Sequence, residues 1–135
     1  MSEGRCTLAD GGHLSYAVEG KGPPLLLLRP LGGSRTSWGR FASALVPHAQ
    51  VVTFDHRGTG RSSDAPSGHA TRALAHDARQ LIDHVGLPQC HVYGISLGGM
   101  AATWLAIDAP TRMRTVSPLR RPYCALADRA HVVRR

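Results

Sequence analysis

A serine between two glycines is the feature of this sequence best suited to chemistry. The pentapeptide 94–98 reads Gly-Ile-Ser-Leu-Gly; a short apolar run precedes it, and apolar residues with helical spacing follow it. A sharp turn from a strand into a helix raises a serine hydroxyl above the edge of a sheet, and small neighbours leave that hydroxyl uncovered. A hydroxyl in this position can attack a carbonyl carbon. The motif therefore predicts acyl transfer, with Ser96 as the nucleophile.

The segments on either side of Ser96 must place it at such a turn. Continuous apolar runs are typical of parallel strands that helices cover on both faces, and three such runs predict strands over residues 24–28, 51–54 and 91–93. Helical spacing of apolar residues predicts helices over residues 36–46, 74–85 and 97–105. We expect Trp38, Phe41 and Trp104 on these helices to pack in the core rather than to line a ligand pocket. The alternation predicts an α/β fold with a mostly parallel sheet and right-handed crossovers.

The N-terminal residues predict an antiparallel pair of strands. Residues 7–12 and 13–19 are short strand-like segments around a turn at Asp10, Gly11 and Gly12. Glycine in such a turn supplies the positive φ angles that a tight hairpin needs. We expect this hairpin at one edge of the sheet.

The alternation of strands and helices stops near residue 115. A further buried strand is due after Pro110, but Pro118 and Pro122 interrupt the segment, and proline has no N–H group for a central strand. We therefore divide the chain into a domain over residues 1–115 and an arginine-rich tail over residues 116–135. A stretch rich in arginine, alanine and proline that replaces a strand resembles GC-rich coding DNA translated out of frame. We expect this tail to be disordered or frame-shifted.

The net charge of +7 comes almost entirely from the C-terminal end. Residues 112–135 contain seven of the 16 basic residues and one of the nine acidic residues. Such arginines attract nucleic acid through its phosphates, but neither interleaved aromatic residues nor a helical basic face accompanies them. The pattern therefore disfavours nucleic acid as a partner.

Cysteine usage and hydropathy indicate where the protein works. The three cysteines, Cys6, Cys90 and Cys124, lack the spacing of a metal site or of a disulfide framework, which fits a reducing cytoplasm. The N-terminal residues contain no apolar signal segment, and the longest aliphatic run, residues 25–28, is too short to cross a membrane. We expect a cytoplasmic protein without a membrane partner.

Taken in order, residues 8–115 resemble the N-terminal portion of the α/β-hydrolase fold family, in its esterase, lactonase and haloperoxidase-like group. Three motifs carry the resemblance: the nucleophile elbow around Ser96, the loop over residues 29–34, and the turn over residues 55–62. That turn follows the family's Asp-x-Arg-Gly-x-Gly-x-Ser pattern, and its expected role is structural. The resemblance implies a partial α/β-hydrolase sheet, mostly parallel with an N-terminal antiparallel hairpin, and truncated after the helix that follows the elbow.

The resemblance also implies a mechanism. A Ser96 acyl-enzyme would form from a small-molecule carboxylic ester or lactone, with no metal and no organic cofactor. The backbone N–H groups of Leu97 and Leu31 would form the oxyanion hole. The loop begins with Arg29 and Pro30, where the family more often has His-Gly. Pro30 has no N–H group, but the donor position falls on Leu31, which has one.

A working hydrolase of this family also needs a carboxylate and then a histidine after the nucleophile. After Ser96 the sequence contains Asp108, Asp128 and His131. Asp108 would end the helix after Ser96, about 18 Å along it at about 1.5 Å per residue, and no strand or loop signal precedes His131. We therefore expect the acid and the histidine of the triad to be missing, and the chain to be inactive or weakly active alone.

Two other interpretations stay open. In one, the chain is a non-catalytic remnant, or a fragment that needs a separately encoded C-terminal half. The sheet would then end in an exposed edge beside the strand of Ser96, which favours self-association. In the other, the chain binds nucleic acid through its basic tail.

Overall fold

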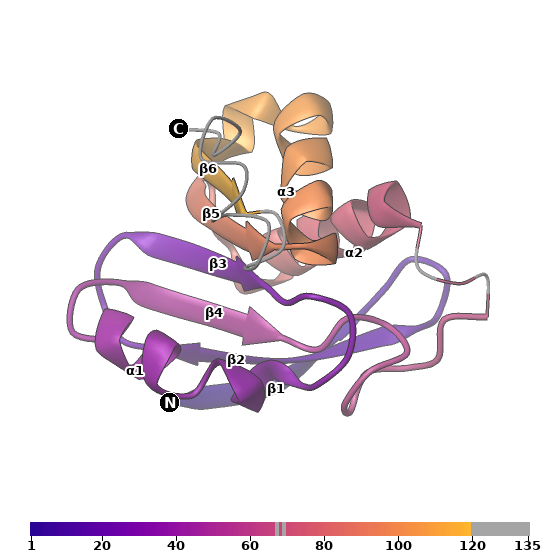
Figure 1. Cartoon of the computed structure of the whole chain (residues 1–135), viewed down its shortest axis with the longest axis horizontal. Helices are drawn as coiled ribbons and strands as arrows, with labels where there is room; N and C mark the ends of the chain where they lie inside the picture. The colour runs from indigo at the N-terminus through magenta and orange to yellow at the C-terminus, as the bar shows by residue number, and fades with distance from the viewer. Residues whose placement is uncertain (67, 69, 120–135) are drawn as a thin grey trace, which may run out of the picture.

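One six-stranded mixed sheet organises the protein. The computed structural model describes residues 1–66, 68 and 70–119. Along the chain the strands are β1 Ser2–Thr7, β2 His13–Glu19, β3 Pro24–Leu28, β4 Gln50–Phe54, β5 Cys90–Ile95 and β6 Met113–Leu119. Their order in space is β1-β2-β4-β3-β5-β6 (Figure 1). β2 is antiparallel to both β1 and β4, whereas β4, β3, β5 and β6 run parallel. This arrangement confirms the predicted α/β class and the N-terminal antiparallel hairpin. The first strand of the hairpin was predicted too late in the chain, because β1 covers residues 2–7 and residues 8–12 form the turn.

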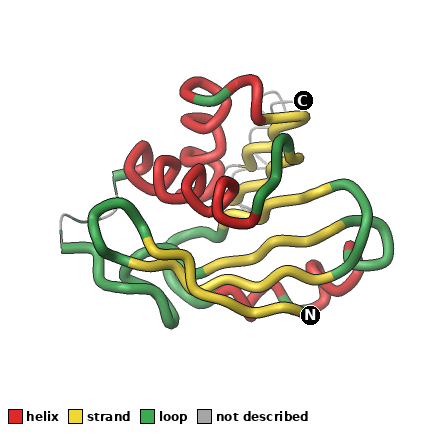
Figure 2. The backbone as a smooth tube through the Cα atoms, turned by 180° about the vertical axis from the view of Figure 1, so that it is seen from behind, coloured by secondary structure: helices red, strands yellow, loops and turns green. Residues whose placement is uncertain are grey.

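The helices cover the two faces of the sheet unequally. The helical segments are η1 Arg35–Trp38, α1 Arg40–Leu45, α2 Thr71–Val85, α3 Leu97–Asp108 and η2 Pro110–Arg112. α2 and α3 lie against one face of the sheet, and η1 and α1 lie against the other (Figure 2). α3 directly follows β5, so the turn between these two elements is the turn that contains Ser96.

β3 is buried on both of its faces. Leu26 and Leu28 belong to the large core under α2 and α3, and Leu27 belongs to a smaller core with Trp38 and Val51. All three leucines are 0% exposed. Successive side chains of a strand point to opposite faces of the sheet. The continuous apolar run therefore predicted a central parallel strand correctly.

Gly39 divides the helix that was predicted over residues 36–46. Its φ of +49° lies outside the right-handed helical region, so η1 ends before it and α1 begins after it. Trp38 packs in the smaller core with 6% exposure, as predicted, whereas Phe41 is 42% exposed, which contradicts its predicted core position. Trp104 is half-buried and packs against the large core.

A strand forms where the sequence predicted none. β6 pairs in parallel with β5, so the prediction that the strand pattern stops near residue 115 is wrong. The Ser96 N–H donates to the Leu119 carbonyl at 2.7 Å, so the peptide groups of Leu119 face β5 and those of Pro118 face away from it. β6 is an edge of the described sheet. An edge strand tolerates proline when its missing N–H faces away from the neighbouring strand.

The predicted basic tail begins inside the fold. Arg112 donates from Nη1 to Asp83 at 2.6 Å, from Nη2 to the Leu87 carbonyl at 2.8 Å and from Nε to the Pro88 carbonyl at 2.9 Å. This arginine therefore ties η2 to the segment that follows α2. Residues 120–135, which make up most of the predicted tail, lie outside the described residues, and their disorder stays a prediction.

The turn after β4 is held together by a buried carboxylate, as the sequence motif predicted. Asp55 is 3% exposed and accepts hydrogen bonds from the backbone N–H groups of Arg35 at 2.5 Å and Arg61 at 2.9 Å. A Cβ atom at Gly60 would lie 2.2 Å from the Asp55 carboxylate, so only glycine fits there. The role of this motif is structural.

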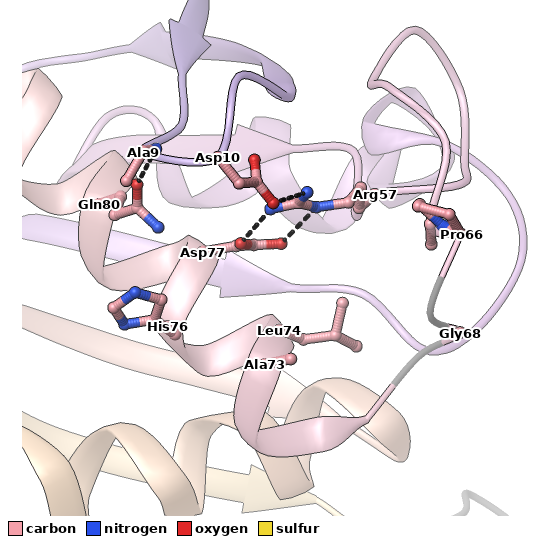
Figure 3. A pocket seen from close by; sticks show the side chains of 11 residues that line it. Ala9, Asp10, Arg57, Pro66, Gly68, Ala73, Leu74, His76, Asp77 and Gln80 are labelled. Carbon is pink, nitrogen blue, oxygen red and sulfur yellow. Dashed lines mark hydrogen bonds and ion pairs between the residues drawn. The ribbon is translucent and has the colours of Figure 1, made fainter.

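A buried ion pair joins the same turn to α2. Arg57 donates from Nε and Nη2 to the two carboxylate oxygens of Asp77, at 3.1 and 2.7 Å, and from Nη1 to Asp10 (Figure 3). These hydrogen bonds to carboxylates raise the pKa of the Arg57 guanidinium. The three charged residues also line a pocket of about 290 Å³ beside α2. The pair fixes the turn against the helix.

Asp77→Ala should lower the free energy of unfolding, measured by urea denaturation, by about 3 kcal/mol. The reason is that the variant removes the buried partner of a guanidinium that is only 16% exposed. Asp108→Ala is the matched control, because it removes the exposed partner of Arg72, and we expect little change from it. Equal losses in the two variants would contradict the role assigned to the buried pair.

Candidate active site

Ser96 occupies a strained turn between β5 and α3. Its φ is +55° and its ψ is −116°. Among the described residues it is the one residue other than glycine with a positive φ. Residues other than glycine rarely adopt such a backbone conformation, and it persists only where the surrounding structure enforces it. The turn from strand to helix that the pentapeptide predicted is therefore present, with Ser96 at its apex.

Close backbone contacts enforce this turn. A Cβ atom at Gly94 would lie 2.2 Å from the Gly98 carbonyl oxygen, and one at Gly98 would lie 2.2 Å from the Leu28 carbonyl oxygen. The start of α3 is thereby pressed against the end of β3. The flanking glycines predicted space around the serine, and the structure shows in addition that they let the helix backbone touch the sheet backbone.

The two predicted oxyanion donors lie on neighbouring elements. Leu97 is the first residue of α3, where N–H groups have no acceptor within the helix and the helix dipole favours negative charge. Leu31 lies in the loop after β3, and its side chain is 62% exposed. β3 and β5 are adjacent and parallel, so the loops that follow them leave the sheet at the same edge. The fold therefore brings the Leu31 loop to the elbow.

Asp108 does not lie at the candidate site. Asp108 is the last residue of α3, and its carboxylate accepts hydrogen bonds from Arg72 Nε at 3.1 Å and Nη2 at 2.9 Å. It is therefore engaged far along the helix from Ser96, as the sequence predicted. Asp128 and His131 lie outside the described residues.

No metal centre is formed by the part of the chain that the structure describes, since no group of three histidine, cysteine, aspartate or glutamate side chains there could hold an ion. The described helices include none that is both long and apolar enough to cross a membrane.

Arg29 belongs to the same region, although sequence reasoning treated it only as a departure from the usual loop. Its guanidinium carbon lies 5.4 Å from the ring centroid of Trp38, and its carbonyl oxygen accepts a hydrogen bond from His56 Nε2 at 2.9 Å. The Trp38 ring is stacked on Phe41, and Phe41 on Tyr93, at 5.5 and 5.1 Å between centroids. Burial raises the pKa of the Tyr93 hydroxyl. The position of Arg29 directly after β3 was the signal that could have identified it.

The geometry defines a class of protein, and comparison with known proteins agrees with it. Residues 23–117 match the model of the α/β-hydrolase fold, so this chain belongs to the α/β-hydrolase fold family. It is 35% identical over 111 residues to RutD of Azorhizobium caulinodans, and this match covers 81% of the chain and 42% of the relative. RutD of Variovorax paradoxus is 38% identical over 107 residues, which cover 76% of the chain and 40% of the relative. Both relatives carry the name of a carbamate hydrolase.

Solved structures of hydrolases share the fold. A hydrolase from Pseudomonas aeruginosa matches with a TM-score of 0.79 and 30% identity over 95% of this chain and 51% of its own. The enol-lactonase from Burkholderia xenovorans matches with a TM-score of 0.75 and 28% identity over 82% of this chain and 44% of its own. The chain thus spans about two fifths of the length of the curated relatives.

Ser96→Gly should raise the free energy of unfolding by about 1 kcal/mol. Glycine relieves backbone strain of about 1–3 kcal/mol and costs about 0.5–1 kcal/mol in chain entropy. Urea denaturation followed by circular dichroism measures the change. Ser117→Gly in β6 is the control, because a strand position gains nothing from glycine, and that variant should be less stable. If both variants lose stability equally, the elbow is not strained.

Proposed function

We propose that Ser96 is the nucleophile of an acyl-transfer site that hydrolyses a small carboxylic ester or lactone. The observation that carries the proposal is the positive φ of Ser96 at the turn from β5 into α3. Strain of this kind is typical of a residue that is held for chemistry. The names of the relatives and structural neighbours, which include carbamate hydrolases, an esterase and lactonases, support a small acyl substrate.

The proposed reaction has two steps. Ser96 Oγ attacks the carbonyl carbon, its proton passes to a base, and the carbonyl oxygen becomes an oxyanion that accepts hydrogen bonds from the N–H groups of Leu97 and Leu31. The oxyanion collapses, the bond to the leaving oxygen breaks, and that oxygen takes the proton. Water then attacks the acyl-enzyme by the same route, which releases the acid and restores the Ser96 hydroxyl.

We propose that the base of this site does not lie among the described residues. Among the described residues, the carboxylate that follows Ser96 is Asp108, which pairs with Arg72 at the far end of α3. We therefore propose that the 135-residue chain is a weak catalyst alone. The alternative is a fragment that works with a separately encoded C-terminal half. Its support is that the chain spans about two fifths of its relatives' length, and that β6 lies at the edge of the described sheet.

Association and location remain proposals of the same kind. Self-association through β6 would use the outward N–H group of Val116, while Pro118 offers none and the ladder with β5 is irregular at Arg114, so this edge can form only a short ladder. A reducing cytoplasm is supported by the buried thiols of Cys6 and Cys90. Burial raises the pKa of Cys90 to about 11, so this thiol stays protonated and unreactive.

An alkyl fluorophosphonate should label Ser96 in preference to the other serines, although slowly, because the described residues supply no base to take the proton. The phosphonyl oxygen takes the place of the substrate oxyanion, so the N–H groups of Leu97 and Leu31 favour the adduct only at Ser96. Peptide mass spectrometry locates the label. Ser96→Ala should abolish the labelling, and Ser62→Ala should leave it unchanged. Labelling spread evenly over the serines would contradict the assignment of Ser96 as the nucleophile.

Hydrolysis of p-nitrophenyl acetate by the purified 135-residue chain should be slow. Removing the histidine of a triad reduces turnover by roughly 10⁴- to 10⁶-fold, and oxyanion stabilisation alone leaves only the remainder. Release of p-nitrophenol, measured against Ser96→Ala, checks this expectation. Ordinary turnover that Ser96→Ala abolishes would show that the chain contains its own base.

A further inference from the structure

Two arginines lie over tryptophan rings, and they differ in their partners. The guanidinium carbon of Arg72 is 4.6 Å from the ring centroid of Trp104, and that of Arg29 is 5.4 Å from the ring centroid of Trp38. Arg72 also forms two hydrogen bonds to the carboxylate of Asp108. The guanidinium of Arg29 forms no hydrogen bond or ion pair with the described residues. One cation therefore has a carboxylate partner and the other has none.

The lack of a partner for Arg29 lowers the free energy of unfolding. Arg29 Nε is fully buried without a hydrogen-bond partner, and burial lowers the pKa of the guanidinium. Arg29 as a whole is only half-buried, so the cost falls on this one N–H group, which has left water without finding a hydrogen-bond partner. An unpaired buried N–H group of this kind marks a candidate ligand site, because a bound ligand can supply the missing acceptor.

Arg29 lies between the two parts of the candidate site. A Cβ atom at Gly98 would be 2.6 Å from the Arg29 carbonyl oxygen, and a Cβ atom at Gly33 would be 2.9 Å from Arg29 Nη2. Its backbone thus contacts the start of α3, and its guanidinium contacts the loop that carries Leu31. A substrate bound at Ser96 between this loop and α3 would lie beside the cation.

We propose that Arg29 binds a carboxylate of the substrate, so that the site prefers esters or lactones with a second, ionised carboxyl group near the scissile carbonyl. This inference rests on the proposed function of Ser96. The guanidinium matches a carboxylate with two parallel N–H···O hydrogen bonds. Contact with the Trp38 ring holds the guanidinium in place before the ligand arrives, which reduces the entropy lost on binding.

The test measures binding by the whole chain, so it does not need a complete triad. Monomethyl glutarate carries one ester and one carboxylate, and dimethyl glutarate carries the ester without the charge. The chain has two tryptophans, so in a Trp104→Phe background the fluorescence of Trp38 reports a ligand at Arg29. We expect saturable binding of monomethyl glutarate, and binding of dimethyl glutarate that is at least about tenfold weaker.

Two arginine variants separate this site from general charge attraction. Arg29→Gln should weaken the binding of monomethyl glutarate at least about tenfold and leave the binding of dimethyl glutarate unchanged. Arg72→Gln should keep the preference for monomethyl glutarate. The thermal midpoint of Arg29→Met should be unchanged or higher, because an unpartnered charge is removed. A purely structural arginine would instead lower that midpoint.

The outcomes distinguish this inference from the function on which it rests. Equal affinity for the two ligands, or equal effects of Arg29→Gln and Arg72→Gln, would overturn the role of Arg29 while fluorophosphonate labelling of Ser96 stands. A lower midpoint for Arg29→Met together with unchanged binding would also overturn it. A carboxylate preference that depends on Arg29 in a chain whose Ser96 is not labelled would confirm the anion site and refute the nucleophile.

Discussion

Contact between the backbone of α3 and the backbone of the sheet fixes the position of every group in the candidate site. A side chain at Gly98 would collide with the Leu28 carbonyl oxygen, and one at Gly94 would collide with the Gly98 carbonyl oxygen. Because no side chains separate these elements, the chain must turn sharply between β5 and α3, and Ser96 takes the positive φ of that turn. The same contact brings the loop after β3 against the start of the helix. The strained φ of Ser96 and the close packing at Gly94 and Gly98 therefore have the same cause, which is the contact between α3 and the sheet.

The charged residues divide according to what they stabilise. Arg57 with Asp77 and Arg112 with Asp83 join separate segments of the chain, and these pairs hold the turn after β4 and the segment after α2 in place. The Arg29 guanidinium has no such partner among the described residues. Arg29 therefore differs from Arg57 and Arg112 in its surroundings, and this difference is the basis of the anion site proposed above.

The region that matches the family covers only part of the length of the relatives. The match over residues 23–117 includes the elbow, the loop after β3 and the turn after β4, so the elements that carry the proposed nucleophile and the two proposed oxyanion donors lie within the matched region. The relatives extend well beyond the matched region, since the chain spans about two fifths of their length. Stabilising an oxyanion and removing a proton are separate tasks, and the function proposed for the described residues covers the first of them.

The order of the elements as far as α3, and the elbow itself, could be predicted from the sequence. These predictions rest on short apolar runs, helical spacing and paired glycines. Such patterns indicate burial and local φ angles, which depend mainly on residues close together in the chain. The predicted β3, α2 and the turn at Ser96 were accurate for that reason. Local rules were also sufficient to place Asp108 away from the site, because the length of a helix follows from its residue count.

Other features depend on contacts between segments that are distant in the sequence. Pro118 lies within β6 because its missing N–H faces away from β5, and which side of a strand a proline faces depends on the neighbouring strand rather than on the sequence around it. Gly39 divides a helix whose spacing was otherwise regular. The place of Arg29 over Trp38, between the elbow and its loop, likewise depends on elements that meet only in the folded chain.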